Sequence, residues 1–301
     1  MNELISKHEY DILIKKSLFY KGRFSTENEL YFDKDYLESL FQHLKRENLF
    51  EIFDKEVCKK DGRPEKMGSV ASSARLCYLY FHDPKFADSK IQYEHQANCL
   101  GIERAKANLD AFSEKNGTKT YYECKCHEFV EGEGEVFVDS YQKIIKDLFE
   151  LDSIQMLPCI TKSGHLIKSK SGKQRYYLKL SQKEMNINVP SEQGGSLYDM
   201  HFNVKQLICH LLGIANEIMK DKEDGLNNQY VLHYVFFVPS PSLNDDALNS
   251  YYSLLENEIE AISKSKIQDF AEKHGITLNL KGDLENKIDV GTIEDFVSPI
   301  K

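Results

Sequence analysis

An α/β fold with the element order αβββαβ is predicted by three features of the sequence. Three strand-like segments follow one another closely at 90–98, 106–114 and 119–129. Helical periodicity precedes them at 69–81 and follows them at 202–220. A near-continuous apolar run at 230–240 then predicts a central strand buried on both faces. We therefore expect a mixed sheet flanked by helices, with N-terminal and C-terminal helical additions.

The three consecutive strands should form an antiparallel meander because their connections are short. Asn116 and Gly117 stand between the second and third strands, and Asn-Gly is the strongest local signal for a tight hairpin. The preceding helix begins with serines, carries an apolar stripe and should stop near Asp83 and Pro84.

Helical patterns also occupy the flanking regions. Residues 35–53 predict a helix, residues 131–152 predict an acidic loop running into an amphipathic helix, and residues 247–274 predict a long helix before a short strand at 276–282. We expect an N-terminal helical region at 1–66 packed on the core, a core at 67–240 with a basic insertion at about 160–183, and a C-terminal extension at 241–301.

The composition is that of a folded, acidic protein. Of 301 residues, 41% are hydrophobic and 29% are charged, so extensive disorder is not expected. A net charge of -9 argues against a protein whose main role is to coat nucleic acid, because phosphate binding needs clustered cations. A nuclease is not excluded, since a divalent cation neutralises its acidic site and a local basic patch meets the phosphates.

The cellular setting is expected to be reducing. The start of the chain is polar and no run of about 18 apolar residues occurs, which predicts a cytoplasmic protein with no membrane contact. The cysteines number seven, an odd count, and most lie within apolar patterns. Reduced thiols that pack as small core residues are therefore expected instead of disulfides.

One constellation of charged residues points to chemistry. Asp110 lies in the second predicted strand, and Glu123 and Lys125 lie thirteen and fifteen positions later in the third. Because side chains alternate along a strand, Glu123 and Lys125 should share a face while Cys124 points to the other. If the two strands pair around the Asn-Gly turn, Asp110 comes opposite Glu123, where adjacent strands lie about 4.8 Å apart.

Two carboxylates at that spacing repel each other unless a cation neutralises them. Mg²⁺ takes oxygen ligands at about 2.0–2.1 Å and keeps waters in its remaining positions, so it suits such a pair, and Mn²⁺ is expected to substitute. A metal held by Asp110 and Glu123 would polarise a phosphodiester oxygen and lower the pKa of a bound water. Lys125 would orient the attacking water, help to deprotonate it or stabilise the pentacovalent charge.

An acidic residue, a short turn and then E-x-K on the next strand, within an αβββαβ order, resembles the PD-(D/E)XK nuclease superfamily. The strings A-N-L-D-A, E-C-K-C-H-E and K-Q-L-I-C-H-L-L-G-I are similar to a group of bacterial restriction endonucleases. The resemblance covers roughly residues 69–240 and implies a restriction-endonuclease-like fold and a metal-dependent endonuclease. Asp110 follows Leu109 where the motif's name has proline, a variation common in the superfamily.

The resemblance also implies further site residues. An additional acidic residue often completes the metal shell, for which Glu94 on the first strand is the candidate and Glu128 a second one. A polar residue of the second core helix often faces the site, a position that Gln206 fits.

Other interpretations stand beside these. Asp110, Glu123 and Lys125 could form an exposed cross-strand charge cluster with little effect on stability. Cys124, Cys126 and His127 suggest zinc, but strand alternation turns His127 away from both cysteines and no second ligand pair follows. His210, on an apolar helix face, is expected to be a hydrogen-bonded core histidine.

The stretch 161–183 contains seven cations and no acidic residue, interleaved with tyrosines and turned by glycines. It predicts either a solvated hairpin or an arm that binds a nucleic-acid backbone. The four positions expected to contact phosphate are Lys168, Lys170, Lys173 and Arg175.

The leading functional hypothesis is a Mg²⁺-dependent endonuclease that acts on double-stranded DNA in restriction. A homodimer would suit symmetric cutting of both strands. The alternatives are a repair, mobile-element or RNA-processing nuclease of the same fold, and a nucleic-acid-binding subunit without catalysis.

Overall fold

The structure is a computed structural model of the chain. It describes residues 5–18, 24–58, 65–128, 130, 137–138, 141, 144, 147, 154–158, 163–166, 168, 175–180, 201–240, 246–280 and 288–289.

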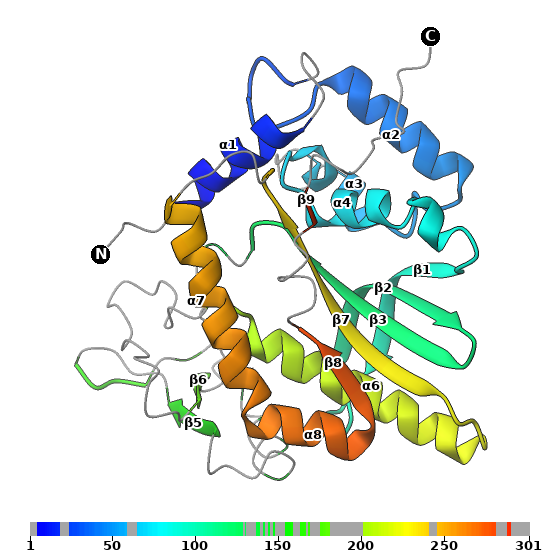
Figure 1. The fold of residues 1–301 in the computed structure, drawn as a ribbon, viewed down its shortest axis with the longest axis vertical. Coiled ribbons are helices and arrows are strands. Elements are labelled where there is room, and N and C mark those ends of the chain that lie inside the picture. Colours follow the sequence, from blue (N-terminus) through cyan, green and yellow to red (C-terminus); the bar gives the residue numbers. More distant parts are fainter. Residues whose placement is uncertain are drawn as a thin grey trace.

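A mixed β-sheet forms the centre of the molecule (Figure 1). Its strand order is β1-β2-β3-β7-β8, and the short β9 pairs with the C-terminal end of β7. The bounds are β1 (Ile91–Asn98), β2 (Lys106–Lys115), β3 (Thr118–Lys125), β7 (Gln229–Val238), β8 (Ile276–Asn279) and β9 (Ile288–Asp289). β1, β2 and β3 are antiparallel, whereas β7 runs parallel to β3 and β8. The predicted meander and central strand are therefore confirmed.

The β2–β3 hairpin closes where the sequence predicts. Asn116 and Gly117 both adopt positive φ, at 53° and 75°, which is the backbone of a tight turn that follows the right-handed twist of its strands. Asparagine tolerates this conformation and glycine adopts it without strain. This turn fixes the register of the two strands that carry Asp110 and Glu123.

Helices cover both faces of the sheet, as predicted (Figure 1). On one face, α4 (Ser73–Tyr80) begins at Ser72, whose side chain accepts from the Arg75 N–H, and the aromatic rings around its end pack on Tyr93 and Tyr122. On the other face, α6 (Val204–Glu223) places Glu217 in hydrogen bonds with His95 and Tyr121. These are called the α4 face and the α6 face below.

Close approach of α6 to the sheet depends on Gly213. A Cβ at this position would lie 2.6 Å from the Cβ of Ala107 and 3.1 Å from that of Ala97. The small residues on both elements let the helix pack directly over β1 and β2. Gln206 and His210, at the start of α6, are thereby held above β3.

One register break interrupts the first two strands. β1 and β2 pair from Ile91↔Ser113 to Asn98↔Lys106, but within these fully described strands Glu94 and Asp110 have no ladder partner. Glu94 has φ 52°, so Tyr93 packs on the α4 face while His95 contacts the α6 face. Regular alternation would place residues 93 and 95 on one face.

The flanking helices join the same hydrophobic core. The N-terminal helices are α1 (Lys7–Ser17), α2 (Lys34–Arg46) and α3 (Asp54–Val57), and the C-terminal ones are α7 (Asp246–Ser263) and α8 (Lys266–His274). Tyr10 of α1 contacts Tyr252 of α7 at 3.2 Å between hydroxyl oxygens and donates to the Phe237 carbonyl of β7 at 3.4 Å. Helices α1 and α7 thus meet beside the central strand β7. Short 3₁₀ turns at Lys66–Gly68 and Pro84–Phe86 flank α4.

Two predicted helices are shorter than expected. The helix predicted at 35–53 ends at Arg46, because Asn48 adopts φ 60°, which stops the helical path before α3. The helix predicted at 247–274 is two helices, since Ser265 is extended and caps α8 by accepting from the Ile267 N–H.

A second, smaller sheet has the order β4-β6-β5, from β4 (Phe137–Val138), β5 (Ile154–Pro158) and β6 (Arg175–Leu180). β5 and β6 pair antiparallel, but only β6 lies within the basic stretch at 161–183, because β5 precedes it. In Figure 1 these two strands lie at the lower left, apart from the main sheet. The helix predicted at 131–152 falls mostly outside the described residues.

Among the described residues, no helix is both long and apolar enough to span a bilayer. The six described cysteines are free thiols. Cys77, Cys99, Cys124 and Cys126 are buried, as expected of small core residues, whereas Cys58 is exposed.

Candidate active site

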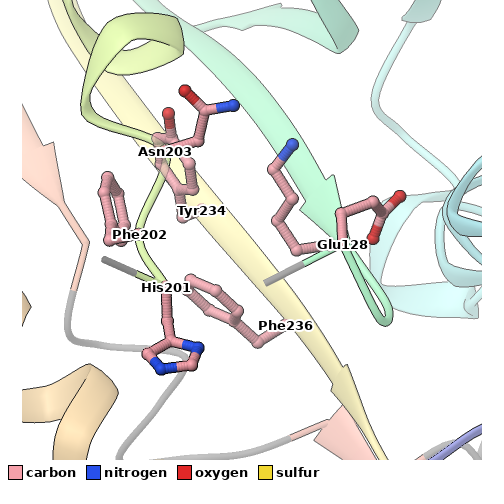
Figure 2. Close-up of a pocket in the computed structure, with 7 residues that line it drawn as sticks. Glu128, His201, Phe202, Asn203, Tyr234 and Phe236 are labelled. Atoms are coloured by element: carbon pink, nitrogen blue, oxygen red, sulfur yellow. The ribbon is translucent and has the colours of Figure 1, made fainter. Parts of the chain in front are cut away.

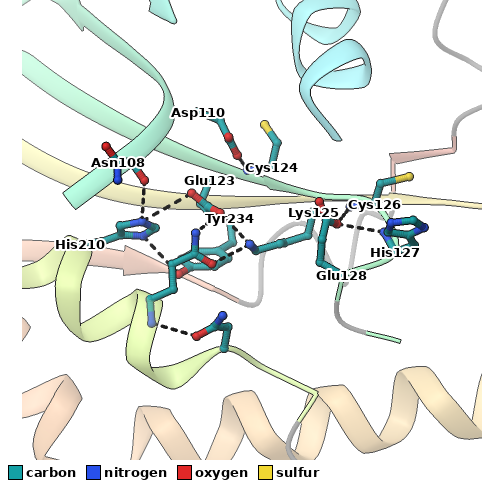
Figure 3. Close-up of polar contacts among 12 residues, drawn as sticks. Asn108, Asp110, Glu123, Cys124, Lys125, Cys126, His127, Glu128, His210 and Tyr234 are labelled. Atoms are coloured by element: carbon teal, nitrogen blue, oxygen red, sulfur yellow. Dashed lines mark hydrogen bonds and ion pairs between the residues drawn. The ribbon is translucent and has the colours of Figure 1, made fainter. Parts of the chain in front are cut away.

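Glu123, Lys125 and Gln206 form a closed ring of polar contacts on the α6 face, and Figure 3 labels Glu123 and Lys125 of this ring. The Lys125 Nζ lies 2.7 Å from Glu123 Oε1 and donates to Gln206 Oε1 at 2.6 Å. The Gln206 Nε2 donates to the same Glu123 oxygen at 2.7 Å. β3 supplies the acid and the lysine two residues apart on one face, and the first turn of α6 supplies the amide.

The second oxygen of Glu123 is differently placed. The Glu123 side chain is 4% exposed, and no hydrogen-bond donor reaches Oε2 among the described residues. The nearest polar group is His210 Nε2 at 3.6 Å, and that nitrogen also lies 3.0 Å from the Asn108 carbonyl oxygen. Because a carbonyl only accepts, Nε2 carries a proton, which leaves Nδ1 to face the Tyr234 hydroxyl at 3.4 Å.

Asp110 lies where β2 and β3 part. Their ladder ends at Ala111↔Tyr122, one pair short of the expected Asp110–Glu123 pair. The Asp110 carboxylate instead accepts from the backbone N–H of Cys124 at 2.7 Å, as a strand carbonyl would in a continuous ladder. Burial and the charge of Glu123 raise the pKa of Asp110 well above its ordinary value, against the smaller lowering by Lys125.

Glu94 and Asp110 line one hollow of about 310 Å³ on the α4 side. Ser72 and Ser73, at the start of α4, and Glu128 line it as well. Burial raises the pKa of Glu94, and the charges of Glu56 and Glu123 raise it further. The break in the β1–β2 ladder therefore brings two carboxyl groups, both disfavoured in their charged form, to one cavity.

Lys125 and Glu128, at and just after the end of β3, carry opposite charges that act on each other's pKa. Burial alone would lower the pKa of Lys125, but the charges of Glu123, Glu128 and Asp110 raise it above its usual value. Burial would raise the pKa of Glu128, but Lys125 and a hydrogen bond from Ser73 lower it. Glu128 also accepts from the N–H groups of Cys126 and His127, at 2.7 and 3.0 Å. Both side chains are thus held in their charged forms.

A second hollow beside Lys125 is small, about 10 Å³ (Figure 2). Lys125 and Glu128 line one side, and Phe202, Tyr234 and Phe236 supply aromatic walls. A space of this size holds about one water molecule. The larger hollow, next to Asp110 and Glu94, is the one with room for part of a substrate.

The structure brings most of the sequence-predicted site residues into one neighbourhood. Glu123, Lys125 and Gln206 touch one another, and Glu94 and Asp110 share a cavity, while Glu128 lines both hollows. The predicted juxtaposition of Asp110 and Glu123 is not formed: the ladder ends before this pair, Asp110 faces the hollow on the α4 side, and Glu123 faces α6. The Glu123 charge nevertheless acts on the pKa of Asp110.

The predicted nucleic-acid contacts are only partly described. Lys168 is exposed, and Arg175 begins β6, paired with Val138. Lys170 and Lys173 lie outside the described residues.

His210 is the site residue that the sequence did not single out. It is 1% exposed, and its contacts to Asn108 and Tyr234 fit the expected core histidine, but it also faces Glu123. Its spacing of four residues from Gln206 puts both on one face of α6, the one sequence signal that points to it.

Glu94, Asp110 and Glu123 carry the oxygen donors that a hard divalent cation prefers, and they act on one another through their charges. Their carboxylate oxygens do not all lie within 4.8 Å of one another, so one ion could be held by all three only after side-chain movement. A buried carboxylate oxygen without a hydrogen-bond donor, such as Glu123 Oε2, is stabilised by a cation.

No protein-family model matches the chain, and no curated protein or solved structure gives a significant match.

Proposed function

We propose that this chain is a Mg²⁺-dependent endonuclease with a restriction-endonuclease-like fold of the PD-(D/E)XK type, acting on double-stranded DNA. The supporting fold features are the αβββαβ order, the antiparallel meander and the parallel pairing of β3 with β7. Glu123 and Lys125 of the E-x-K motif lie beneath the start of α6, and Asp110 of β2 lies on the α4 side.

One observation carries the proposal. Where the β2–β3 ladder ends, the buried Lys125 is ion-paired with Glu123, and the charges of Glu128 and Asp110 also act on it. An exposed charge cluster, the alternative interpretation, would be solvated, yet the Glu123 and Lys125 side chains are 4% and 11% exposed. Burying such a group costs several kcal/mol, about 3 or more if a partner is lost, so a functional reason is expected.

Each residue of the ring has a role in this proposal. The raised pKa of Lys125 keeps its ammonium charged, so it donates hydrogen bonds to a phosphate oxygen or an attacking water and does not act as the base. Gln206 fixes the direction of both Glu123 and Lys125 and is a positioning residue. His210, whose Nε2 donates to the Asn108 carbonyl, lies 3.6 Å from the second Glu123 oxygen and leaves that oxygen without a hydrogen-bond donor.

Asp110 and Glu94 would hold the metal ion in the hollow on the α4 side, and Glu123, which faces α6, would join them by turning its side chain where β2 and β3 part. When bound, Mg²⁺ or Mn²⁺ supplies a Lewis acid for the phosphodiester and a water of lowered pKa. The hollow beside Asp110 and Glu94 would take the scissile phosphate. Glu128 lines the same hollow, and its charge helps to keep Lys125 protonated.

Double-stranded DNA is proposed because a basic stretch interrupts an otherwise acidic chain. Its strand β6 pairs antiparallel with the preceding β5, so an arm could reach along a duplex backbone. The same arm would also suit RNA or single strands, so the assay must contain all of these substrates.

The test is cleavage of plasmid, linear duplex, single-stranded DNA and RNA by the purified chain, with and without Mg²⁺, followed by end sequencing. Glu123→Gln and Lys125→Ala should each abolish metal-dependent cutting while the protein stays folded. Glu114→Gln is the matched control, since Glu114 is exposed at the far end of β2.

Cutting that persists in both Glu123→Gln and Lys125→Ala would overturn the proposal. Calorimetric titration with Mg²⁺ and Mn²⁺ separates a nuclease from a binding subunit. A subunit without catalysis should show no metal binding that depends on Asp110 and Glu123.

A further inference from the structure

A second polar cluster lies away from the candidate active site, where the end of α2 meets the segment just after α4. His43 and Glu47 are four residues apart and therefore project from the same side of α2 and its C-terminal cap. His82 comes two residues after α4. One ligand atom from each of the three lies within 4.8 Å of the others.

We propose that His43, Glu47 and His82 bind one divalent transition-metal ion of the zinc class. Two imidazole nitrogens and one carboxylate oxygen are a ligand set that zinc takes with a fourth position left open. Mg²⁺ and Ca²⁺ prefer oxygen ligands, so this site and the acidic site at Asp110 should select different ions. The two sites share no residue.

The spacing of the ligand atoms already suits such an ion. His82 Nε2 lies 3.1 Å from Glu47 Oε2, and His43 Nε2 lies 3.3 Å from Glu47 Oε1. Ligands about 2.0–2.1 Å from a tetrahedral zinc ion are about 3.3 Å apart. A metal ion between these atoms therefore requires only small shifts of three side chains.

Hydrogen bonds around the cluster orient two of the ligands. His82 Nδ1 lies 2.7 Å from the Tyr78 carbonyl oxygen, which can only accept, so Nδ1 carries a proton. In the neutral ring, Nε2 then presents its lone pair to the Glu47 carboxylate, and a cation between them would stabilise both. The Tyr78 hydroxyl donates to Glu47 Oε2 at 2.8 Å. Metal-binding histidines and carboxylates usually have such partners.

His43 must change its tautomer before its Nε2 can bind a metal ion. Its Nδ1 lies 3.3 Å from a nitrogen of Arg46, which can only donate, so the metal-free ring carries its proton on Nε2. Metal binding would move that proton to Nδ1 and displace Arg46, which is exposed and can turn into solvent.

The position suggests what the ion would do. The ligand side chains are 23%, 33% and 26% exposed, so an ion could enter from solvent. It would clamp α2 to the end of α4, the helix whose start lines the hollow beside Asp110. The ion would join the N-terminal helices to the core, and water would take its open fourth position.

The test is titration of the full chain with Zn²⁺ by calorimetry and with Co²⁺ by visible absorption, in excess Mg²⁺. A Cys58→Ser background removes the exposed thiol that would bind zinc adventitiously. One ion per chain is expected. His43→Gln and His82→Gln should each weaken Zn²⁺ binding at least as much as loss of an outer partner, about 10–100-fold, and Tyr78→Phe about 10-fold.

His8→Gln is the control, because His8 is exposed on α1 and far from the cluster in sequence. Circular dichroism checks that each variant is folded, and Glu47→Gln replaces any histidine variant that is not. Unchanged Zn²⁺ affinity in the ligand variants, or no binding by the Cys58→Ser chain, would overturn the proposal.

Discussion

Asp110 lies directly across the β1–β2 ladder from Glu94, at the position where neither residue has a ladder partner. Glu94 adopts φ 52°, a conformation that costs a residue with a Cβ about 1–2 kcal/mol. The break turns Tyr93 and His95 to opposite faces and opens the hollow that both acids line. Backbone strain thus coincides with the carboxyl groups to which we assign metal binding.

Asp110→Asn should make the metal-free protein more stable at neutral pH. The folded-state pKa of Asp110 is raised, so the folded chain holds its proton more tightly, and stability is lost as pH rises from the unfolded value towards the folded pKa. Asparagine keeps an acceptor for the Cys124 N–H without the charge, which predicts a gain of about 1 kcal/mol. Denaturant unfolding at pH 5 and pH 8 without divalent ions measures it.

The gain should be larger at pH 8 than at pH 5, and metal-dependent cutting should be lost. A variant less stable than the parent at pH 8 would show that the Asp110 charge is compensated in the metal-free protein. Glu114→Asn, exposed on the same strand, serves as the control.

Strain at Glu94 can be separated from its charge. Glu94→Gly should be more stable than Glu94→Gln by about 1 kcal/mol, because glycine adopts positive φ without a Cβ clash. Both variants remove the carboxylate, so both should weaken Mg²⁺ binding equally. Thermal unfolding and Mg²⁺ calorimetry test the two effects separately, and equal stability of the variants would argue against strain.

The meander was predictable from sequence because its signals are local. Alternating patterns and Asn116-Gly117 fix the strands and their register, and the same alternation puts Glu123 and Lys125 on one face. The positive φ of Glu94 was not predictable, since glutamate carries no such preference and the break depends on packing against two helices. The same holds for Asn48: the sequence pattern predicts a helix through this residue, but its positive φ ends α2 just before it.

Contacts between distant segments also escaped prediction. His210 faces Glu123 only because Gly213 lets α6 pack close to the sheet. The zinc-class cluster joins His43 to His82 across two helices, so no spacing in the sequence announces it. Sequence alone identified Asp110, Glu123 and Lys125 on one hairpin, and the resemblance added Gln206, which packing brings to Glu123 and Lys125. The contact of His210 with Glu123 and the zinc-class cluster were missed.

Gln206→Ala should reduce both stability and cutting. It removes the Nε2 donor from Glu123 and the acceptor from Lys125, two buried charged groups, which predicts a loss of about 1–3 kcal/mol. Cleavage should fall by about 10–100-fold, as for other positioning partners of a metal site. Lys220→Ala, exposed on the same helix, is the control, and full activity in Gln206→Ala would contradict the positioning role.

Asp221 should stabilise the far end of α6 in a pH-dependent way. It accepts from Lys119 at 2.7 Å, Tyr230 at 2.6 Å and Asn228 at 3.1 Å. Burial would raise its pKa, but these hydrogen bonds lower it. A depressed folded pKa gives stability that is present above the unfolded value and is lost as pH falls through the folded one.

Asp221→Asn should therefore cost about 2 kcal/mol at pH 7 and progressively less towards pH 3. Unfolding curves across this range measure the difference from the parent protein. Asp224→Asn, exposed at the end of the same helix, should show no such dependence. A penalty that stays constant down to pH 3 would show that the charge of Asp221 is not what stabilises the helix end.

The basic stretch should set the salt dependence of DNA binding. Each phosphate that a cation neutralises releases counterions, so the slope of log affinity against log salt should fall by about 0.9 for each bound cation that is removed. The variant replaces the four predicted phosphate-binding residues, Lys168, Lys170, Lys173 and Arg175, by alanine. Binding is measured by fluorescence anisotropy on a duplex, in Ca²⁺ so that no cutting occurs.

The control neutralises four exposed lysines elsewhere, namely Lys34, Lys220, Lys264 and Lys273. If the two variants have the same slope as the parent, the arm does not bind DNA and the backbone must be bound by another surface.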